Sequence, residues 1–352
     1  MSNTLPCGTR NYEYGQDMAI FRTRTQWVLL IAFLIVLFCV PLFISNFWLN
    51  KINLIGITLI AATGLNILVG YCGQLSIGHV GFMAVGAYTS AILTGKLGLP
   101  FPVAFLCAGL MAGIIGLIFA IPSVRVKGFY LAITSIAAQF IIIYVIQKWT
   151  DMTGGTNGLV VADASLFGYV FASQTSFFYL IAVVAVACIF FAKNLGRTRT
   201  GRAFIAIRDN DLAAEVMGIN LFYYKMLAFF IGCFMAGIAG SLLAHWSVAI
   251  SPDNFSFSES ILYVGMIIIG GLGTTLGPIL GVVLIRLLQV GVTQATPWLH
   301  ESLTWMSTGF ASGITPMLFG LIIVVFLIFE PRGLAHRWNL FKASYRLWPF
   351  SY

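Results

Sequence analysis

Charge is what this sequence has least of. Only 9% of its 352 residues are charged and only 11 are Asp or Glu, whereas a soluble globular domain carries roughly 25% charged residues. A water-exposed surface cannot be covered with so few charges, so lipid must cover much of this one. The 36 glycines agree, because glycine is more frequent in membrane-spanning helices than in soluble ones. The composition therefore excludes an ordinary soluble protein.

The net charge of +8 does not by itself indicate nucleic acid, because that interpretation needs a folded soluble face that carries the charge. The basic residues instead lie in short segments between apolar runs, a pattern typical of membrane proteins. The six cysteines show no spacing typical of a metal site, and most fall in or beside apolar runs. We expect small buried thiols, no disulfide, no metal and no nucleic-acid partner.

Runs of about 20 apolar residues, long enough to cross a bilayer as a helix, recur along the chain. The candidate spans are 27–49, 52–71, 76–94, 101–122, 129–147, 175–192, 224–247, 259–272, 275–293 and 311–329. A glycine-rich segment at 271–278 is all that separates the eighth run from the ninth, so these two form two short spans, one broken helix or a re-entrant pair. Non-helical backbone at membrane depth survives only where protein or a wet cavity shields it. We predict an all-α, polytopic transmembrane helical bundle of about ten spans, with eight as the lower bound.

The basic residues also predict an orientation. With the N-terminus in the cytoplasm, most of the 19 Lys and Arg residues fall on the inner side, as the positive-inside rule requires. We therefore predict a cytoplasmic N-terminal tail at 1–26, a transmembrane domain at 27–335 with an inner loop at 193–223, and a cytoplasmic C-terminal tail at 336–352.

Motifs for catalysis are missing. There is no His-Glu-x-x-His pair to hold zinc, and no Gly-x-x-x-x-Gly-Lys-Ser/Thr loop to cradle ATP phosphates. Ser76 lies in a segment similar to a Gly-x-Ser-x-Gly elbow, with His79 nearby, but the first glycine is one residue too far away and no acid is near. A small-residue face for close helix contact is the simpler interpretation. We predict no catalytic residue, and any ATP that drives the protein must bind another subunit.

Ionisable groups within the apolar runs are equally scarce. All eleven acidic residues fall in loops or at span edges, and Arg286 is the one ionisable residue deep in a run. Buried carboxylates are typical of proton or sodium relays, so their scarcity argues against ion-coupled transport. Arg286 either snorkels, pairs helices or lines a pathway.

The inner loop at 193–223 contains the signals of a short helix. Residues 209–211 have side chains that cap helices, two alanines follow that favour helix, and a glycine can end it. Leu212 and Val216 would form an apolar side, and because a short helix is unstable alone, we expect it to dock in a partner's groove rather than to be a solvated loop. The residues assigned to it are Asp209, Asp211, Leu212, Ala213, Ala214, Glu215 and Gly218.

This helix is where a resemblance to a known family enters. The pattern Ala213-Ala214-x-x-x-Gly218 resembles the Glu-Ala-Ala-x-x-x-Gly coupling loop of bacterial ABC importer permeases, with Leu212 in place of the family's glutamate. Other blocks resemble the LivM-type subunit of the branched-chain amino acid permease family; they are 73–82 with 86–88, 125–134, 153–158, 270–273 with 277–278, and 331–334. Candidates for the pathway or for helix packing are Gln74, Ser76, Gly78, His79, Tyr130, Thr134, Thr153, Gly154, Gly155, Asn157, Gly270, Gly271, Gly273 and Arg286.

The resemblance implies the permease subunit of an ATP-binding-cassette importer in a bacterial inner membrane, which translocates branched-chain or related hydrophobic amino acids. It also implies a second, related permease subunit, two ATPase subunits that bind ATP and Mg, and a periplasmic substrate-binding protein that docks on the outer loops, chiefly 148–174 and 248–258. Urea and short-chain amide permeases share this family, so the solute stays open. A secondary transporter that works without ATP, a membrane-embedded enzyme and a structural scaffold are the alternatives.

Overall fold

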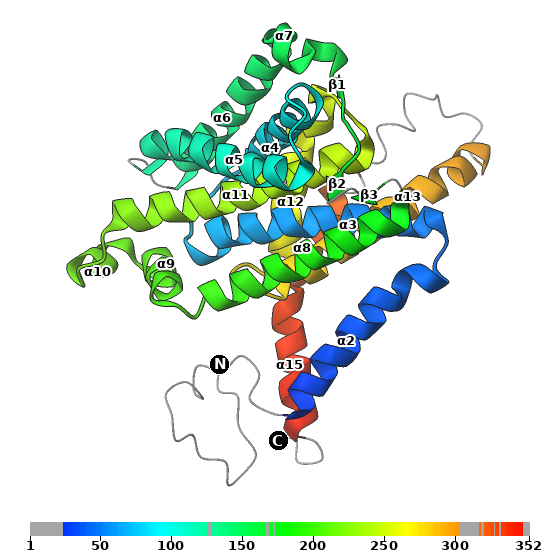
Figure 1. Cartoon of the computed structure of the whole chain (residues 1–352). Helices are drawn as coiled ribbons and strands as arrows, with labels where there is room; N and C mark the ends of the chain where they lie inside the picture. The colour runs from blue at the N-terminus through cyan, green and yellow to red at the C-terminus, as the bar shows by residue number, and fades with distance from the viewer. Residues whose placement is uncertain are drawn as a thin grey trace.

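The computed structural model describes residues 24–124, 128–166, 169–171, 173–302, 317, 320–326, 328–330 and 332–347. Helices dominate these residues, as predicted (Figure 1). The bundle helices are α2 (Arg24–Phe43), α3 (Asn46–Leu65), α4 (His79–Gly95), α5 (Phe101–Val124), α6 (Phe129–Lys148), α8 (Gln174–Leu195), α11 (Leu221–Ser247), α12 (Phe257–Gly270) and α13 (Gly277–Ser302). A π-helical segment, η1 (Asn66–Tyr71), continues α3.

Six helical segments in the described residues are long and apolar enough to cross a membrane. They are Asn46–Tyr71, Phe101–Pro122, Tyr130–Lys148, Gln174–Leu195, Leu221–Ser247 and Gly277–Gln294. Each predicted run from 27–49 to 275–293 coincides with a helix, whereas the run 311–329 lies partly outside the described residues. The all-α prediction is confirmed, and the number of ten spans and the cytoplasmic position of the tails stay predictions.

The boundary between the first two helices lies earlier than predicted. The chain leaves α2 after Phe43 and enters α3 at Asn46, so the end of the predicted run 27–49 belongs to α3. Ser45 has the extended backbone of an N-cap residue. Ser and Asn are favoured at the N-cap over the helix interior. A prediction that only counts apolar residues does not detect a helix start marked in this way.

Small residues let the central helices pack closely. Helix α11 packs against α5, α4 and α3, and α3 also packs against α8. A Cβ atom on Gly86 of α4 would overlap the backbone of Gly237 on α11, so the two helices approach each other through glycine. Close contact through small residues is also the interpretation that the sequence favoured for the segment around Ser76.

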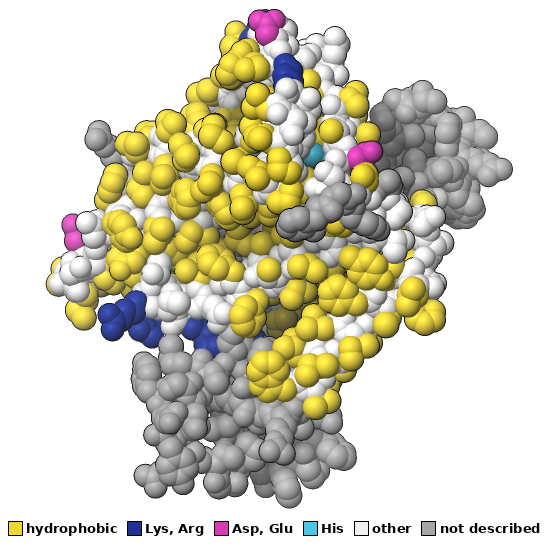
Figure 2. All heavy atoms as spheres, in the orientation of Figure 1, with side chains coloured by type: hydrophobic (Ala, Val, Ile, Leu, Met, Phe, Trp, Pro, Cys, Tyr) yellow, Lys and Arg dark blue, Asp and Glu magenta, His cyan; other side chains and the backbone are white. Residues whose placement is uncertain are grey.

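The outer surface of the bundle is apolar. Figure 2 shows a nearly continuous hydrophobic face over α5, α6 and α11. On α5 exposed large side chains recur every three or four residues; they include Val103, Leu106, Leu110, Ile114, Ile118 and Ile121. On a helix of a soluble protein the apolar stripe faces the core, whereas on α5 it faces outward, which fits contact with lipid. The chain is therefore a multi-pass membrane protein.

Short strands join two connecting segments that are far apart in the sequence. After α6 come α7 (Thr150–Thr153) and η2 (Gly155–Asn157), and then β1 (Leu159–Val160) pairs antiparallel with β4 (Ala249–Ile250). The other short elements are β2 (Ser165–Leu166), which pairs with β3 (Tyr169–Val170), and η3 (Pro252–Phe255). The β1–β4 pair was not predicted; it links the two loops expected to receive a binding protein.

The eighth and ninth runs form a helical hairpin. A Cβ atom on Gly270 would overlap Gly277, and one on Gly281 would overlap Met266, so α12 and α13 run antiparallel from a tight turn. With 14 residues, α12 rises about 21 Å, short of the roughly 30 Å hydrocarbon core. The hairpin therefore has one short arm and one long arm.

Candidate functional site

The short helix predicted in the 193–223 loop is present as α10 (Asp211–Val216). Its N-cap is Asn210, whose side-chain oxygen accepts a hydrogen bond from the backbone N–H of Ala213 at 3.1 Å. After the helix, Gly218 has a φ of +83°, the left-handed conformation that favours glycine and turns the chain away. The prediction of a short capped helix is confirmed, with Asn210 rather than either aspartate as the cap.

Helix α10 exposes its large apolar side chains and is held to the bundle by a small one. Leu212 is 65% exposed, Val216 is 88% exposed and the adjacent Met217 is 82% exposed, whereas Ala214 is only 3% exposed. Among the other predicted residues, those with exposed side chains are Asp209, Ala213 and Glu215. Exposed apolar side chains on a short surface helix are typical of a surface that a partner protein covers.

Helix α9 (Arg199–Asp209) connects α10 to the bundle. Its inner face buries Phe204 and Ile207. At its end, Arg208 Nη1 donates a hydrogen bond to the carbonyl oxygen of Gly70, at 2.9 Å, while Nε donates to the carboxylate of Asp209. Because Gly70 lies in η1, this hydrogen bond joins the end of α9 to the π-helical continuation of α3.

Asn66, at the start of η1, binds the turn of the α12–α13 hairpin. Its Nδ2 donates to the carbonyl oxygen of Thr274 at 2.9 Å, and its Oδ1 accepts from the backbone N–H of Gly273 at 3.0 Å. Within the turn, the Thr274 hydroxyl donates to the Gly271 carbonyl and accepts from the Gly277 N–H. Protein groups therefore satisfy this non-helical backbone, as predicted for irregular structure at membrane depth.

The glycines predicted in this segment have specific positions. Gly271 and Gly273 have φ values of +112° and +72°, and Gly270 lies against Gly277 across the turn. A Cβ atom on Gly273 would lie 2.8 Å from the carbonyl oxygen of Gly70 as well as 2.6 Å from Nη1 of Arg208, and this close backbone approach favours glycine. The hairpin turn, η1 and α9 thus meet at one place, which we call the coupling junction: Asn66, Gly70, Arg208, Gly273 and Thr274.

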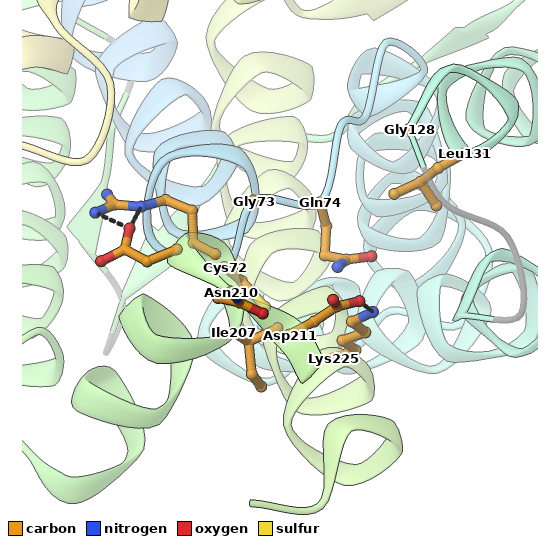
Figure 3. A pocket seen from close by; sticks show the side chains of 11 residues that line it. Cys72, Gly73, Gln74, Gly128, Leu131, Ile207, Asn210, Asp211 and Lys225 are labelled. Carbon is orange, nitrogen blue, oxygen red and sulfur yellow. Dashed lines mark hydrogen bonds and ion pairs between the residues drawn. The ribbon is translucent and has the colours of Figure 1, made fainter. Parts of the chain in front are cut away.

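A cavity of about 340 Å³ opens beside the coupling junction (Figure 3). Lys225 of α11 lines it, is only 5% exposed, and lies 3.9 Å from a carboxylate oxygen of Asp211 at the start of α10. Gln74 points into the cavity toward this pair (Figure 3). A buried ammonium needs a carboxylate nearby, so the pair links α10 to α11. At this end, basic side chains collect beside α9 (Figure 2).

The residues predicted around 73–82 pack helices together. His79 Nε2 lies 3.1 Å from the carbonyl oxygen of Ala61 on α3. A Cβ atom on Gly78 would overlap the carbonyl oxygen of Ser135 on α6. Ser76 is buried and its hydroxyl has no hydrogen-bond partner among the described residues. His79 thus faces α3 rather than Ser76, which favours close helix contact over a hydrolase.

The remaining sequence candidates do not converge on this site. Tyr130 is 70% exposed and Thr134 is half-buried, both near the start of α6. Thr153 is buried, and its hydroxyl donates to the carbonyl oxygen of Ile146 at 2.6 Å. The positive-φ residues Gly154 and Gly155 follow it, and Asn157 is exposed. These last residues shape the turn that leads into β1, at a different end of the molecule from α10 (Figure 1).

Arg286 pairs helices inside the bundle. Its Nε donates to Thr58 Oγ1 of α3 at 3.1 Å, its Nη1 to Gln289 Oε1 at 2.7 Å, and its Nη2 to Glu259 Oε2 of α12 at 3.3 Å. The side chain is 8% exposed, so it does not snorkel, and the guanidinium lies 5.9 Å from the centre of the Tyr263 ring. Of the interpretations open at the level of sequence, helix pairing is the one these contacts support directly.

Four of the five coupling-junction residues were absent from the predicted site: Asn66, Gly70, Arg208 and Thr274. Lys225, in the adjacent cavity, was absent as well. In the sequence, Arg208 and Lys225 are distinguished only as basic residues on the predicted inner side, and Asn66 is a single polar residue within an apolar run. Asn66 is the residue that could have indicated this site from the sequence, because a side-chain amide inside a membrane span needs hydrogen-bond partners. Among the described residues, no group of three or more His, Cys, Asp or Glu could hold a metal ion. The absence of a metal stays a prediction.

A bundle of long apolar helices, with a short exposed helix at one end and polar clusters among the helices, defines a multi-pass membrane protein. The family model described as "Branched-chain amino acid transport system / permease component" matches residues 47–329. The chain belongs to this family of ABC transporter permeases, so the resemblance drawn from the sequence blocks is confirmed.

Similar proteins carry related names. The chain is 32% identical over 287 residues to the "High-affinity branched-chain amino acid transport system permease protein LivM" of Escherichia coli (strain K12), covering 75% of this chain and 68% of that protein. It is 26% identical over 245 residues to a probable LivM of Methanocaldococcus jannaschii, covering 66% and 67%. It is also 26% identical over 295 residues to the "Ribose import permease protein RbsC" of Haemophilus influenzae, covering 80% and 87%. No solved structure matches the chain significantly.

Proposed function

We propose that this chain is the membrane-spanning permease subunit of an ABC importer in a bacterial inner membrane, and that it translocates branched-chain or related hydrophobic amino acids. Separate ATPase subunits bind ATP and Mg and drive the cycle. A second, related permease subunit and a periplasmic substrate-binding protein complete the complex. The observation that carries this proposal is α10, a helix with exposed Leu212 and Val216 that is tied through α9 to the coupling junction.

The contacts outline how ATP would act on the pathway. The ATPase subunits bind α10, and when the two subunits close on each other they displace α10 together with α9. Arg208 transmits the displacement to η1, and Asn66 passes it to the α12–α13 turn. The Asp211–Lys225 contact carries part of the same displacement to α11. In this scheme the nucleotide does not contact the solute. Its binding shifts the helical bundle between two conformations, inward-facing and outward-facing, and the solute pathway is part of both.

The opposite end fits a binding protein. The predicted docking loops, 148–174 and 248–258, are joined by the β1–β4 pair with Leu159 opposite Ile250 and Val160 opposite Ala249. A binding protein that docks there contacts two loops that move as one unit, attached to α6, α8, α11 and α12.

Family membership supports the amino-acid solute, because the LivM relatives carry it in their names. Urea or a short-chain amide is the second candidate in the same family, and a secondary transporter that works without ATP is the third. Uptake of labelled leucine in a strain that lacks this chain, with isoleucine, valine and urea as competitors, separates the first two. Leucine uptake by the purified chain alone, without ATPases, would establish the third.

A matched pair of variants tests the docking helix. We expect Val216→Asp to abolish leucine uptake and co-purification of the ATPases, because the carboxylate must be desolvated in the docking groove. Val160→Asp is the control, since Val160 is similarly exposed, at 80%, but lies at the other end. It should leave the ATPases bound. If both variants retain the ATPases and leucine uptake equally, α10 is not the docking helix.

A further inference from the structure

Two cavities meet at the Arg286–Glu259 ion pair. The larger has a volume of about 460 Å³ and includes Lys51 and Val290 in its wall. The smaller has a volume of about 260 Å³ and includes Met83. Both are lined by Leu54, Glu259 and Arg286, so the ion pair lies in the wall that they share. Together they reach the size of a small-molecule site, with polar and charged side chains mainly in the larger cavity and apolar ones mainly in the smaller.

The ion pair has hydrogen-bonding capacity left over. A guanidinium carries five N–H donors, and Thr58, Gln289 and Glu259 take one from each nitrogen of Arg286. Tyr263 also has a side-chain hydrogen bond with Arg286, so at least one N–H remains for another acceptor. Glu259 binds Arg286 through Oε2 alone, its side chain is 33% exposed, and its Oε1 has no hydrogen bond to a described residue.

The larger cavity has one more positive than negative side chain, so a further carboxylate would balance its charge. Besides Arg286 and Glu259 it holds Lys51, whose ammonium lies 5.5 Å from the centre of the Phe47 ring and makes no ion pair with a described residue. Two cations thus face one carboxylate. Arginine binds carboxylates in a planar, bidentate manner, and such charge-assisted hydrogen bonds are stronger than neutral ones.

The smaller cavity supplies an apolar wall beside these charges. Its lining includes Leu54, Ile57, Val80, Met83 and Leu243. A ligand that fits both cavities carries a carboxylate and an ammonium on the same carbon atom, and a branched aliphatic group attached to that carbon. Uncharged urea or a neutral amide uses neither charge.

We propose that Arg286 and Glu259 form a subsite for the α-carboxylate and the α-ammonium of an aliphatic amino acid in transit, with its side chain in the smaller cavity. This inference rests on the proposed function and names where the solute is held. Arg286 receives the carboxylate with Lys51 nearby, Glu259 receives the ammonium, and the pair re-forms when the solute leaves. An ion pair that exchanges partners in this way neutralises both charges in the empty and the loaded state.

Site-directed labelling of the purified complex, without binding protein, tests the subsite. Val290→Cys places a thiol in the larger cavity, and Leu287→Cys is the control on the same helix, lining a separate apolar pocket. The rate of methanethiosulfonate labelling is read at each position by peptide mass spectrometry. At leucine concentrations about ten times its Kd, occupancy should slow labelling at 290 roughly tenfold and leave 287 unchanged. Isovalerate, isoamylamine and urea should give little protection.

Two further variants separate a ligand role from a structural one. Glu259→Gln keeps the shape and a hydrogen-bond acceptor for Arg286 but loses the charge, so it should abolish protection by leucine. Thr58→Val removes another partner of Arg286 without changing the proposed ligand groups, so protection should persist. Protection by isovalerate equal to that by leucine, unchanged protection in Glu259→Gln, or no protection by leucine would each overturn the subsite. Leucine uptake by the intact importer with no protection at 290 refutes the subsite alone, whereas absent leucine uptake refutes the proposed function.

Discussion

Arg208 offers the sharpest test of how motion passes from α10 into the bundle. Its Nη1 is 2.9 Å from the carbonyl oxygen of Gly70. Replacement by methionine removes this contact while keeping much of the side-chain volume. The exposed face of α10 is unaffected, so the ATPases should still bind. We therefore expect ATP hydrolysis to continue while leucine uptake falls.

The size of the effect follows from the contact. A hydrogen bond from a charged donor contributes about 1.5–3 kcal/mol. The side chain of Arg208 is 36% exposed, so water replaces part of the interaction. We therefore take about 1–1.5 kcal/mol, at or just below the lower limit of that range. Since about 1.4 kcal/mol is a factor of ten in an equilibrium constant, the ratio of leucine transported to ATP hydrolysed should fall roughly five- to tenfold.

Proteoliposomes that contain the complete importer measure both rates in one sample. Arg202→Met is the matched control, because Arg202 is exposed on the same helix and its side chain has no hydrogen bond or ion pair to a described residue. Arg208→Lys should recover only part of the ratio, since lysine lacks the fork that reaches Gly70 and Asp209 together. A ratio that stays at the wild-type value in Arg208→Met would refute this route.

Two further predictions concern folding. Asn66→Leu leaves the Gly273 N–H and the Thr274 carbonyl without their partner, each at a cost of about 1–3 kcal/mol, so the midpoint of thermal unfolding in detergent should fall; an unchanged midpoint would show that the turn finds other partners. Gly86→Ala forces α4 away from α11 at Gly237, and the yield of folded protein should drop, whereas Gly95→Ala on the same helix meets nothing within 4 Å and should be neutral. Equal yields would contradict the close packing.

The parts of the fold that depend on local pattern were predictable from the sequence. Apolar runs located the bundle helices, because a lipid-facing helix needs an apolar surface along its whole length. The capping residues before Ala213 located α10, because the cap and its helix are neighbours in the chain. The predicted glycines at 271 and 273 reflect backbone conformation, which is also a local property.

The contacts that build the site were not predictable in the same way. Arg208 binds a backbone carbonyl 138 positions away, and Asn66 binds backbone groups more than 200 positions away. A carbonyl acceptor leaves no mark on residue identity, so nothing at Gly70 or Thr274 indicates its partner. The β1–β4 pair is hidden for a related reason, since two-residue strands are too short to show an alternating pattern.

Coupling and solute contact depend on different kinds of atoms. At the coupling junction, Arg208 and Asn66 bind backbone groups, which persist when neighbouring side chains change. The two cavities at Arg286 are lined by side chains, and each can change without altering those backbone contacts. Under the proposed function, a common coupling route with an exchangeable lining would account for relatives whose names specify branched-chain amino acids at 32% identity and ribose at 26%. On this argument, substitutions in the cavities alter which solute passes while binding of the ATPases and hydrolysis of ATP persist.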